Sequence, residues 1–576
     1  MSRVSILTKA VNWFTSRKHF KGVTDCPASL TQICQGNVSK ELFYIERPVP
    51  NNDFITKLAD IRRALNKQSC DFNHKSIDLV RNFGLFNLRG NKKLDCNLLK
   101  TQNACIFEEL GYDIPLAMAI MAHNCWVLDP LMQCNFPDEI ILNQLTSGEL
   151  IGTLACNESL SGTDFQSQTS KFHSDGTFSG NKCWVTNIDN AEIFLVSGYD
   201  ENGCMKLGLV RKSEHVRCKA MDVYGSCGIT FGEVIFDNAT VAGQLNCDNA
   251  YSMLVSMMLK CRMHITELCS GLAKSILDEI IAYLRQEPGI VTKRSTREHS
   301  RICEEGTRLT MTCESLAFYM CNVDWASDGI EVALASCRSM DICRKLLSML
   351  TELLDSKIIY SEESRLVNVS NQLELMSHFG WSELVVRLYC GAEFIRQLSS
   401  DSTDQINKFL TEGQCIREKL YHESERHCLS AGKSVFLYDI WEYSKCPWLQ
   451  CHQTETCLIQ LKNSCLHLLL RDGTGVIDDN RQNQQSDLIR LSQLAEHSLA
   501  LLSLQARMHF GKDQGTYNIV KHIGEKAFNY ESAAATKYYI ELCNSGCPQS
   551  EIASKIGRSM LSEGRYNIAY PVQRLF

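Results

Sequence analysis

The hydrophobic period of this chain changes twice, and that double change is the strongest constraint on its fold. Between residues 51 and 148 apolar residues recur at helical spacing, with a break at Gly84. From Leu150 to about Asn246 the period shortens, and β-rich runs alternate with Asp, Asn and Gly turns. Helical periodicity returns after Tyr251 and persists almost to the end. The pattern predicts an α+β fold, mostly α, with an antiparallel β-domain between helical units.

The same changes divide the chain into domains. We expect an N-terminal helical domain (45–149), a middle antiparallel β-domain (150–247), a C-terminal helical bundle (250–400) and an additional helical domain (401–576). The β-rich runs cover residues 184–187, 193–199, 205–212, 229–238 and 239–243. The stretch 105–132 is apolar but carries Ala and Met rather than β-branched residues, which predicts a buried helix. It is too short and too interrupted to cross a membrane, because no apolar run in it reaches the ~20 residues that span a bilayer.

Composition and charge exclude several classes of protein. The 576 residues are 44% hydrophobic and 22% charged, with a net charge of −7. The basic field that recruits nucleic acid is therefore absent, and we expect no nucleic-acid partner. The 29 cysteines are scattered through apolar patterns without paired CxxC sets, and Cys446 to His452 lacks zinc-finger spacing. We interpret the cysteines as reduced core residues rather than as a metal or disulfide framework.

The amino terminus has the character of a mitochondrial transit peptide, which we assign to residues 1–24. It is rich in basic and hydroxyl residues, and its first acidic residue is Asp25. Apolar residues fall on one helical face, namely Val4, Leu7, Val11 and Phe14. The alternative is a plain basic terminus. The pattern favours a mitochondrial location, in the matrix or at the inner membrane.

Two motifs in the β-rich region resemble the flavin-facing strands of acyl-CoA dehydrogenases. They are LACNESLSGTD at residues 154–164 and GNKCWVTN at residues 180–187. Glu158 aligns with the Glu of the family's Thr-Glu-Pro, while Trp184 and Thr186 align with the residues that contact the isoalloxazine ring. The resemblance therefore implies FAD as cofactor, with Glu158, Trp184 and Thr186 as candidate cofactor-binding residues; an aromatic in a β-domain is also often simply core.

The resemblance continues beyond the β-domain. FGEVIFDNATVAG at residues 231–243 is similar to the family's last strands, and Arg262 begins the first long carboxy-terminal helix. The chain then extends about 170 residues beyond the usual end, like the very-long-chain branch and its relative in respiratory complex I assembly, including divergent members of the Enigma type. That branch implies a homodimer, acyl-CoA as a ligand, respiratory-chain assembly factors as partners and contact with the inner-membrane surface.

The catalytic base of the family is missing. Dehydrogenation removes an α-proton from a thioester while hydride passes to the flavin, so a base must stand beside the α-carbon. The family's Glu-Gly-Thr aligns with Phe379-Gly380-Trp381, which puts Phe379 at the base position. In some members the Glu precedes the Arg of the first carboxy-terminal helix, and that alternative base position holds Cys261. No catalytic residue is therefore assigned.

Two nearby carboxylates, Glu374 and Glu383, are the candidates for a relocated base. One helical turn separates Glu383 from the aligned position, about 6 Å, which is too far for direct substitution. We interpret both as solvated helix charges.

The positions that align with the family's FAD pyrophosphate contacts have also changed. The family's phosphate-binding Arg aligns with Glu287, and its Gln in the next helix aligns with Ser300. Its Gln-x-x-Gly-Gly reads Glu352 to Ser356, with Asp355 where a glycine would admit the phosphate. These replacements oppose tight FAD binding, although Arg285, Lys293 or Arg294 could compensate through a register shift. No metal site is expected.

Three functions follow as hypotheses. The first is a catalytically inactive, mitochondrial acyl-CoA dehydrogenase-like protein that acts through protein contacts in fatty-acid oxidation or complex I assembly. The second is an active FAD-dependent dehydrogenase of long-chain acyl-CoA that uses a relocated base such as Glu383. The third is an acyl-CoA-binding sensor without redox chemistry. In the extension, the amphipathic stretch 456–471 either binds a membrane surface or partner or packs on the fold.

Overall fold

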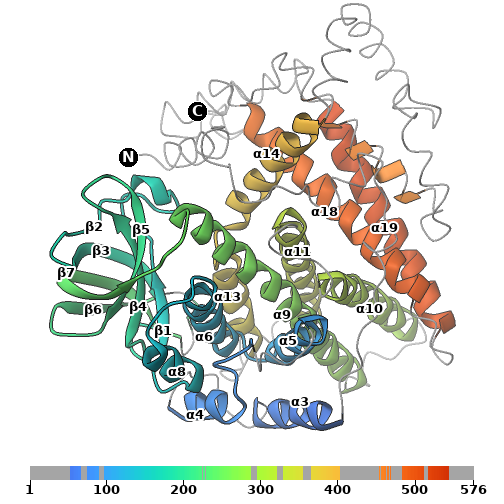
Figure 1. Ribbon diagram of the computed structural model, residues 1–576. Helices are drawn as coiled ribbons and strands as arrows, with labels where there is room; N and C mark the ends of the chain where they lie inside the picture. Colours follow the sequence, from blue (N-terminus) through green and yellow to red (C-terminus); the bar gives the residue numbers. More distant parts are fainter. Residues whose placement is uncertain are drawn as a thin grey trace, which may run out of the picture.

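The computed structural model describes residues 52–65, 74–89, 96–223, 225–226, 229–286, 295–320, 329–354, 365–401, 483–510 and 517–543, with scattered positions between 453 and 468. The predicted transit peptide and most of residues 402–482 lie outside these ranges. Within them the fold is a mostly helical α+β fold, in which helices come first, a sheet follows and helices return. Figure 1 shows the sheet at one side of the helical bundle and the last two helices on the other. The order of elements matches the predicted order of periods, while the domain limits stay predictions.

The first helices are short and end at local signals. They are α3 (Asn52–Leu65), α4 (His74–Asn82), α5 (Cys96–Leu110), α6 (Ile114–His123), the π-helical turn η2 (Asn124–Leu128), α7 (Asp129–Gln133) and α8 (Glu139–Ser147). Helix α4 ends just before Gly84, whose φ of 65° is the left-handed conformation that glycine tolerates best. Helix α8 is capped by Asp138 at its start and by Gly148, with φ 75°, at its end.

The stretch 105–132 is two helices, so the prediction of one continuous buried helix is wrong. Asp113 accepts a hydrogen bond from the Leu116 amide and Pro115 occupies the first turn, and these two signals start a new helix after Gly111. By length and composition the segment Ile114–Gln133 could cross a membrane, contrary to the prediction that it is too short. Its most apolar window is wholly buried inside the fold, as expected for a core helix.

The sheet contains seven strands among the described residues. They are β1 (Gly152–Ala155), β2 (Lys171–Phe172), β3 (Thr177–Thr186), β4 (Ile193–Tyr199), β5 (Met205–Arg211), β6 (Val216–Met221) and β7 (Phe231–Gln244). Most pairs are antiparallel, as predicted, but β1 and β2 both pair with β4 in parallel. The pairings β4–β2–β3–β7–β5–β4 close into a ring around a small apolar core that includes Phe178, Phe194 and Phe236. Residues 229–238 and 239–243 form one strand, β7, which continues through Asn238 with φ 51°.

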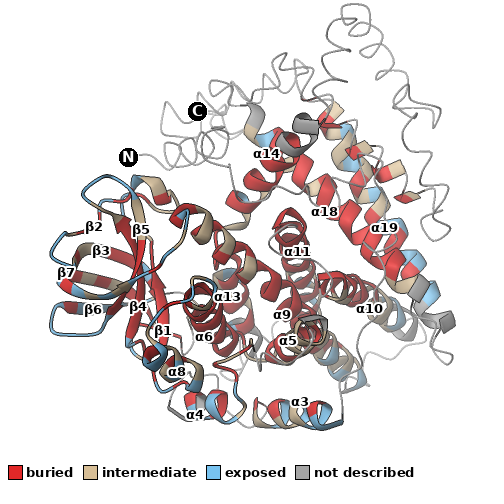
Figure 2. Cartoon of the chain, in the orientation of Figure 1, coloured by how far each residue is buried: buried red, intermediate tan, exposed pale blue. Residues whose placement is uncertain are grey.

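Long helices make up the second helical unit. They are α9 (Ala250–Gln286), α10 (Ser295–Met320), α11 (Gly329–Leu354), α13 (Arg365–Ser377) and α14 (Glu383–Asp401), followed in the extension by α18 (Asn483–Phe510) and α19 (Tyr517–Cys543). Helix α9 begins twelve residues before Arg262, so the prediction that Arg262 begins this helix is wrong. Figure 2 shows α6, α9, α11 and α18 as mostly buried, while α3 exposes an outer face. A single apolar core runs from α3 to α19 and includes Leu254, Leu346 and Leu499.

Glycines allow α5 and α9 to pack at very short range. A Cβ on Gly271 of α9 would lie 1.7 Å from the Glu108 carbonyl oxygen, and one on Gly111 would lie 2.5 Å from the Leu272 nitrogen. Both obstacles are backbone atoms, which cannot rotate away. The approach of α5 to α9 therefore depends on these two glycines.

We predict that Gly271→Ala destabilises the protein by about 1–3 kcal/mol, because the added methyl forces the two backbones apart. Chemical denaturation measures the difference. Gly306→Ala is the matched control, since its nearest obstacle is the Cδ1 atom of Leu277 at 2.8 Å, the free end of a side chain. Equal effects of the two substitutions would contradict the prediction.

Candidate functional site

The aligned base position lies in the connector between α13 and α14. The Phe379 amide donates to the Met376 carbonyl, and the next two residues take left-handed conformations, Gly380 with φ 64° and Trp381 with φ 75°. That conformation is costly for a tryptophan, so neighbouring structure must hold the connector in place.

Arg262 of α9 holds this connector. Its side chain is fully buried, and its Nε donates to the Gly380 carbonyl at 2.9 Å. Its Nη2 donates to the carbonyls of Ser377, at 3.1 Å, and Trp381. The guanidinium therefore binds three main-chain carbonyls of one short segment, and its Nη1 has no hydrogen-bond partner among the described residues. The resemblance used Arg262 only to align the first long carboxy-terminal helix, and no feature of the sequence indicated that it binds the connector.

Phe379 fills the place where a base would stand. The side chain is 5% exposed, and its ring packs against Trp126 of η2 with ring centroids 4.4 Å apart. The phenyl ring and the indole, tilted by 31° to each other, fill the position with apolar atoms and supply no proton acceptor. Trp126 was not predicted as a site residue, and only the alignment of Phe379 could have drawn attention to its surroundings.

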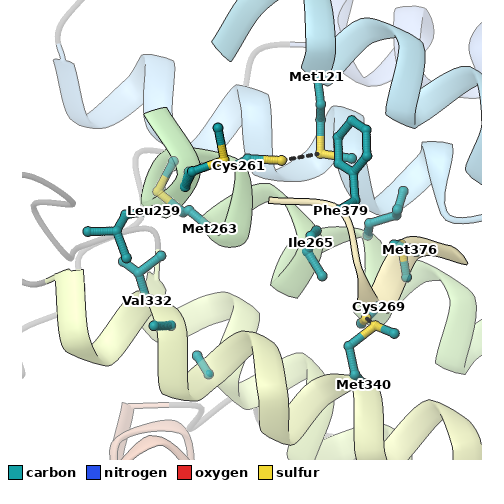
Figure 3. Close-up of a cluster of buried hydrophobic side chains, with 14 of the residues drawn as sticks. Met121, Leu259, Cys261, Met263, Ile265, Cys269, Val332, Met340, Met376 and Phe379 are labelled. Carbon is teal, nitrogen blue, oxygen red and sulfur yellow. Dashed lines mark hydrogen bonds between the residues drawn. The ribbon is translucent and has the colours of Figure 1, made fainter. Parts of the chain in front are cut away.

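The alternative base position is next to the first. A Cβ on Gly380 would lie 3.5 Å from Cys261 Sγ, so the structure brings the two aligned positions together. Cys261 is fully buried, and its Sγ lies 4.0 Å from the Met121 Sδ. Figure 3 shows Phe379 and Cys261 in one cluster of apolar and sulfur-containing side chains. Burial raises the pKa of the Cys261 thiol to about 12, so the group remains protonated and is no base.

The two carboxylates considered as relocated bases are held by arginines. Glu383 accepts a hydrogen bond from Arg344 at 2.9 Å, and its Oε2 lies 3.8 Å from Arg387. Its side chain is only 11% exposed, so the prediction of a solvated charge is wrong for Glu383. Glu374 also binds Arg344 but is half exposed, as predicted. Arg344 of α11, 39 residues away, and Arg387 of the same helix bring Glu383 into a buried ion cluster, and a helical pattern does not reveal the distant partner.

Trp184 and Thr186, the residues aligned with the flavin contacts, lie on β3 but differ in environment. A bulge interrupts the pairing of β3 with β7 between Lys182 and Val185. Trp184 sits in this bulge with φ 57° and is 53% exposed, whereas Thr186 is buried and pairs with Phe231. An exposed indole on strained backbone is compatible with stacking on a flat ligand. Their assignment as flavin contacts stays a prediction.

Glu158, the third aligned residue, is the centre of a buried polar network. Its Oε1 accepts from the Ser170 amide, the Ser170 hydroxyl and the Lys182 ammonium, at 3.0, 2.6 and 2.9 Å. Its Oε2 accepts from the amide and hydroxyl of Thr169. Although burial opposes ionisation, the Lys182 charge and these donors lower the pKa of Glu158 to about 2. Both oxygens are occupied within the β-domain, which argues against the predicted contact with a cofactor.

The aligned pyrophosphate positions are only partly visible. Glu287, Lys293, Arg294, Asp355 and Ser356 lie outside the described residues. Ser300 of α10 and Glu352 of α11 are exposed, and Glu352 accepts a hydrogen bond from Ser348. Neither adds a cation to the region.

The described part of the chain offers few other groups that could bind a metal or a ligand. None of its residues form a group of three or more metal-ligating side chains, and its eighteen cysteines are free thiols, eleven of them buried. The burial of these eleven agrees with the prediction that the cysteines are core residues. A pocket of about 340 Å³ lies in the extension between α18 and α19 and is lined by residues such as Gln505, Met508 and Phe528. It is far in the sequence from both aligned base positions and contains neither of them.

Comparisons with known proteins agree with this architecture. No family model matches the chain. Mitochondrial isovaleryl-CoA dehydrogenase of Pongo abelii is 25% identical over 232 residues, 34% of this chain and 55% of the relative. The Bos taurus enzyme is 24% identical over 233 residues, 34% of this chain and 54% of the relative. The chain thus matches about half the length of these curated relatives.

Solved structures show the fold more fully. An acyl-CoA dehydrogenase of Bacillus anthracis in complex with FAD matches with a TM-score of 0.70 at 14% identity, covering 94% of this chain and all of that one. Butyryl-CoA dehydrogenase of Megasphaera elsdenii matches with a TM-score of 0.54 at 17% identity, covering 62% of this chain and 99% of that one. The chain has the acyl-CoA dehydrogenase fold, and over part of its length it is similar to isovaleryl-CoA dehydrogenases.

We predict that Cys261 resists alkylation in the native protein. Because the thiol is fully buried and protonated, iodoacetamide at pH 8 should label the exposed Cys204 well before Cys261. Peptide mass spectrometry reads both sites, and labelling in denaturant controls for intrinsic reactivity. Rapid native labelling of Cys261 would show an accessible, ionisable thiol at the aligned base position.

We predict that Lys182→Met destabilises the protein by about 3–5 kcal/mol, because it leaves the Glu158 carboxylate buried without its cation. The double variant Glu158→Gln with Lys182→Met should be less destabilised than Lys182→Met alone. The lowered pKa of Glu158 means that its contribution is present above the ordinary value of 4.5 and is lost as the pH falls towards 2. Denaturation at several pH values should show that loss in the wild type and not in Glu158→Gln.

Proposed function

We propose that the protein is a mitochondrial, homodimeric protein of acyl-CoA dehydrogenase fold that does not dehydrogenate acyl-CoA and acts through protein contacts. The observation that carries this proposal is the pair of aligned base positions. Phe379 packs against Trp126, and Cys261 is a buried, protonated thiol beside it. Neither side chain can accept the α-proton on which the reaction depends.

The relocated-base hypothesis has weaker support. Glu383 is bound to Arg344 and lies near Arg387, so a role as base would require the carboxylate to leave two cations. Such a departure would leave buried guanidinium charge without its partner, which is energetically costly.

The residues present fit FAD only in part. Trp184 offers an exposed aromatic face for a flavin ring, and FAD would supply hydride acceptance if it were bound. The cation that the family uses for the pyrophosphate aligns with Glu287, an anion. We propose that any FAD binding is weak and that the fold does not depend on it.

The proposed location and partners rest on sequence features and relatives. The basic, acid-poor amino terminus and the mitochondrial isovaleryl-CoA dehydrogenases both favour mitochondria. The extension of the very-long-chain type favours a role with respiratory-chain assembly factors, at the inner-membrane surface or in control of fatty-acid oxidation.

We predict that the purified full chain, supplied with FAD, reduces no dye when given acyl-CoAs from isovaleryl to long-chain lengths. An active acyl-CoA dehydrogenase serves as the positive control, and calorimetry with the same thioesters separates binding from turnover. Dye reduction that Glu383→Gln abolishes would establish the relocated base and overturn the proposal. Thioester binding without turnover would instead favour the sensor hypothesis.

A cellular test addresses the protein contacts. Deletion of the protein should lower the amount of assembled complex I, and the Glu383→Gln variant should restore it as fully as the wild type, because the role needs no base. Failure of Glu383→Gln together with rescue by the wild type would point to catalysis instead.

A further inference from the structure

The extension meets the bundle through charged groups that are almost entirely buried. Arg387 of α14 binds Glu496 of α18 in a bidentate pair, with Nε–Oε1 and Nη2–Oε2 distances of 2.7 and 3.0 Å. The Glu496 side chain is 2% exposed. A second pair joins Arg338 of α11 to Glu531 of α19 at 2.6 Å, and neither side chain is more than 7% exposed. Charge pairing thus accompanies the apolar contacts of α18 and α19.

The first of these pairs belongs to a cluster with too few cations. Arg387 also donates to Asp341 at 2.6 Å, and Arg344 binds Asp341 and Glu383 at 3.2 and 2.9 Å. Arg344 further binds Glu374, so two guanidinium groups are shared by four carboxylates. The second pair does not correct this excess, because Glu531 already uses Arg338. Like charges held in a weakly screened interior repel one another, and taking up a proton relieves that repulsion.

Glu496 is the member of the cluster best placed to take the proton. Asp341 and Glu374 are 36% and 52% exposed, so solvent screens their charges, and Glu383 is 11% exposed, whereas Glu496, at 2%, is the most deeply buried of the four. The groups that face it are Cys337 and Asp341 of α11, Glu383, Arg387 and Cys390 of α14 and Tyr538 of α19. Helix α10 meets α18 farther along, where Glu314 pairs with Arg507.

We propose that the closed interface between α18 and the bundle binds a proton at Glu496, so that the extension is held more tightly at lower pH. The proposal goes beyond the proposed function and does not depend on the loss of dehydrogenation. It makes the extension a pH-sensitive clamp over α11 and α14. Opening of this clamp would uncover the apolar faces of both helices.

The direction of the pH effect follows from the environment of the carboxyl group. Burial raises the pKa of Glu496 to about 7 in spite of Arg387, from an ordinary value of 4.5 that applies once the interface opens. Between pH 7 and 4.5 the closed interface therefore binds more proton than the open one, and closure strengthens as the pH falls. Above pH 7 both forms are ionised and this dependence ends.

The neighbouring His497 acts in the opposite sense. It lies 2.5 Å from Glu531 and stacks on Tyr538 with ring centroids 5.6 Å apart. Burial and Arg338 lower the pKa of His497, so the open form gains the proton first as the pH falls below about 6.5, and closure weakens. A test must therefore compare variants that share His497.

Cys390 reports opening of this interface. It is fully buried in α14, and it lines the contact with α18 together with Leu491 and Ala495. Pulsed alkylation of the full chain, read by peptide mass spectrometry, measures how often Cys390 becomes accessible. Cys125 in η2 is equally buried but distant from the extension in the sequence, and it reports global unfolding.

The decisive quantity is the Cys390 labelling rate of the wild type divided by that of Glu496→Gln at the same pH. Intrinsic thiol reactivity and the effect of His497 are the same in both proteins, so they cancel in this ratio. The altered hydrogen bond to Arg387 changes the ratio by a constant factor and leaves its slope with pH unchanged. A group with a pKa of about 7 makes the ratio rise about tenfold from pH 6 to pH 8. Cys125 should be labelled more slowly than Cys390 at each pH, because local opening of the interface exposes Cys390 alone.

Glu531→Gln is the matched control. The pKa of Glu531 is lowered to about 2 by Arg338 and His497, which outweigh burial, so this carboxylate does not titrate between pH 6 and 8. Its ratio should change in level without a slope. A Glu496→Gln ratio that is constant within about twofold would overturn the proposal, as would Cys125 labelling as fast as that of Cys390, since Cys390 would then be reached only by global unfolding.

Discussion

The buried guanidinium of Arg262 determines the shape of the aligned catalytic region. It binds the carbonyls of Ser377, Gly380 and Trp381, and so it fixes a connector in which Gly380 and Trp381 have positive φ. Charge-assisted hydrogen bonds of this kind compensate much of the cost of burying the cation. Because the connector is fixed from α9, the approach of α13 and α14 to the bundle depends on this one side chain.

Buried ionic contacts recur wherever distant segments of this chain meet. Glu158 and Lys182 join the loop after β1 to β3, and Arg338 and Glu531 join α11 to α19. Such pairs add less stability than apolar burial, because both charges are desolvated, but removing one partner is strongly destabilising. They therefore act mainly on geometry: they specify which loop and which helix pack together.

How far the sequence predicts this structure depends on how local the signals are. The run 193–199 is strand β4 to the residue, and Gly84 ends a helix, since both signals are local. The cap and proline that divide the stretch 105–132 were also local but were outweighed by its apolar composition. Strand β6 escaped prediction because only its first residue is buried, so it lacks an apolar face. The parallel pairing of β1 with β4 depends on contacts about 40 residues apart, and no period records them.

The candidate site, too, could be predicted only in part. Resemblance located Phe379 and Cys261, and the structure places them side by side. The role of Arg262 and the capture of Glu383 by arginines involve residues up to 119 positions apart, which one sequence does not pair. Arg262 binds main-chain carbonyls, so its hold on the connector does not depend on the side chain at position 379. A carboxylate there could be replaced by a phenyl ring without loosening the connector. That independence explains how the fold can persist without the chemistry, whereas a change at Arg262 itself would affect the fold first.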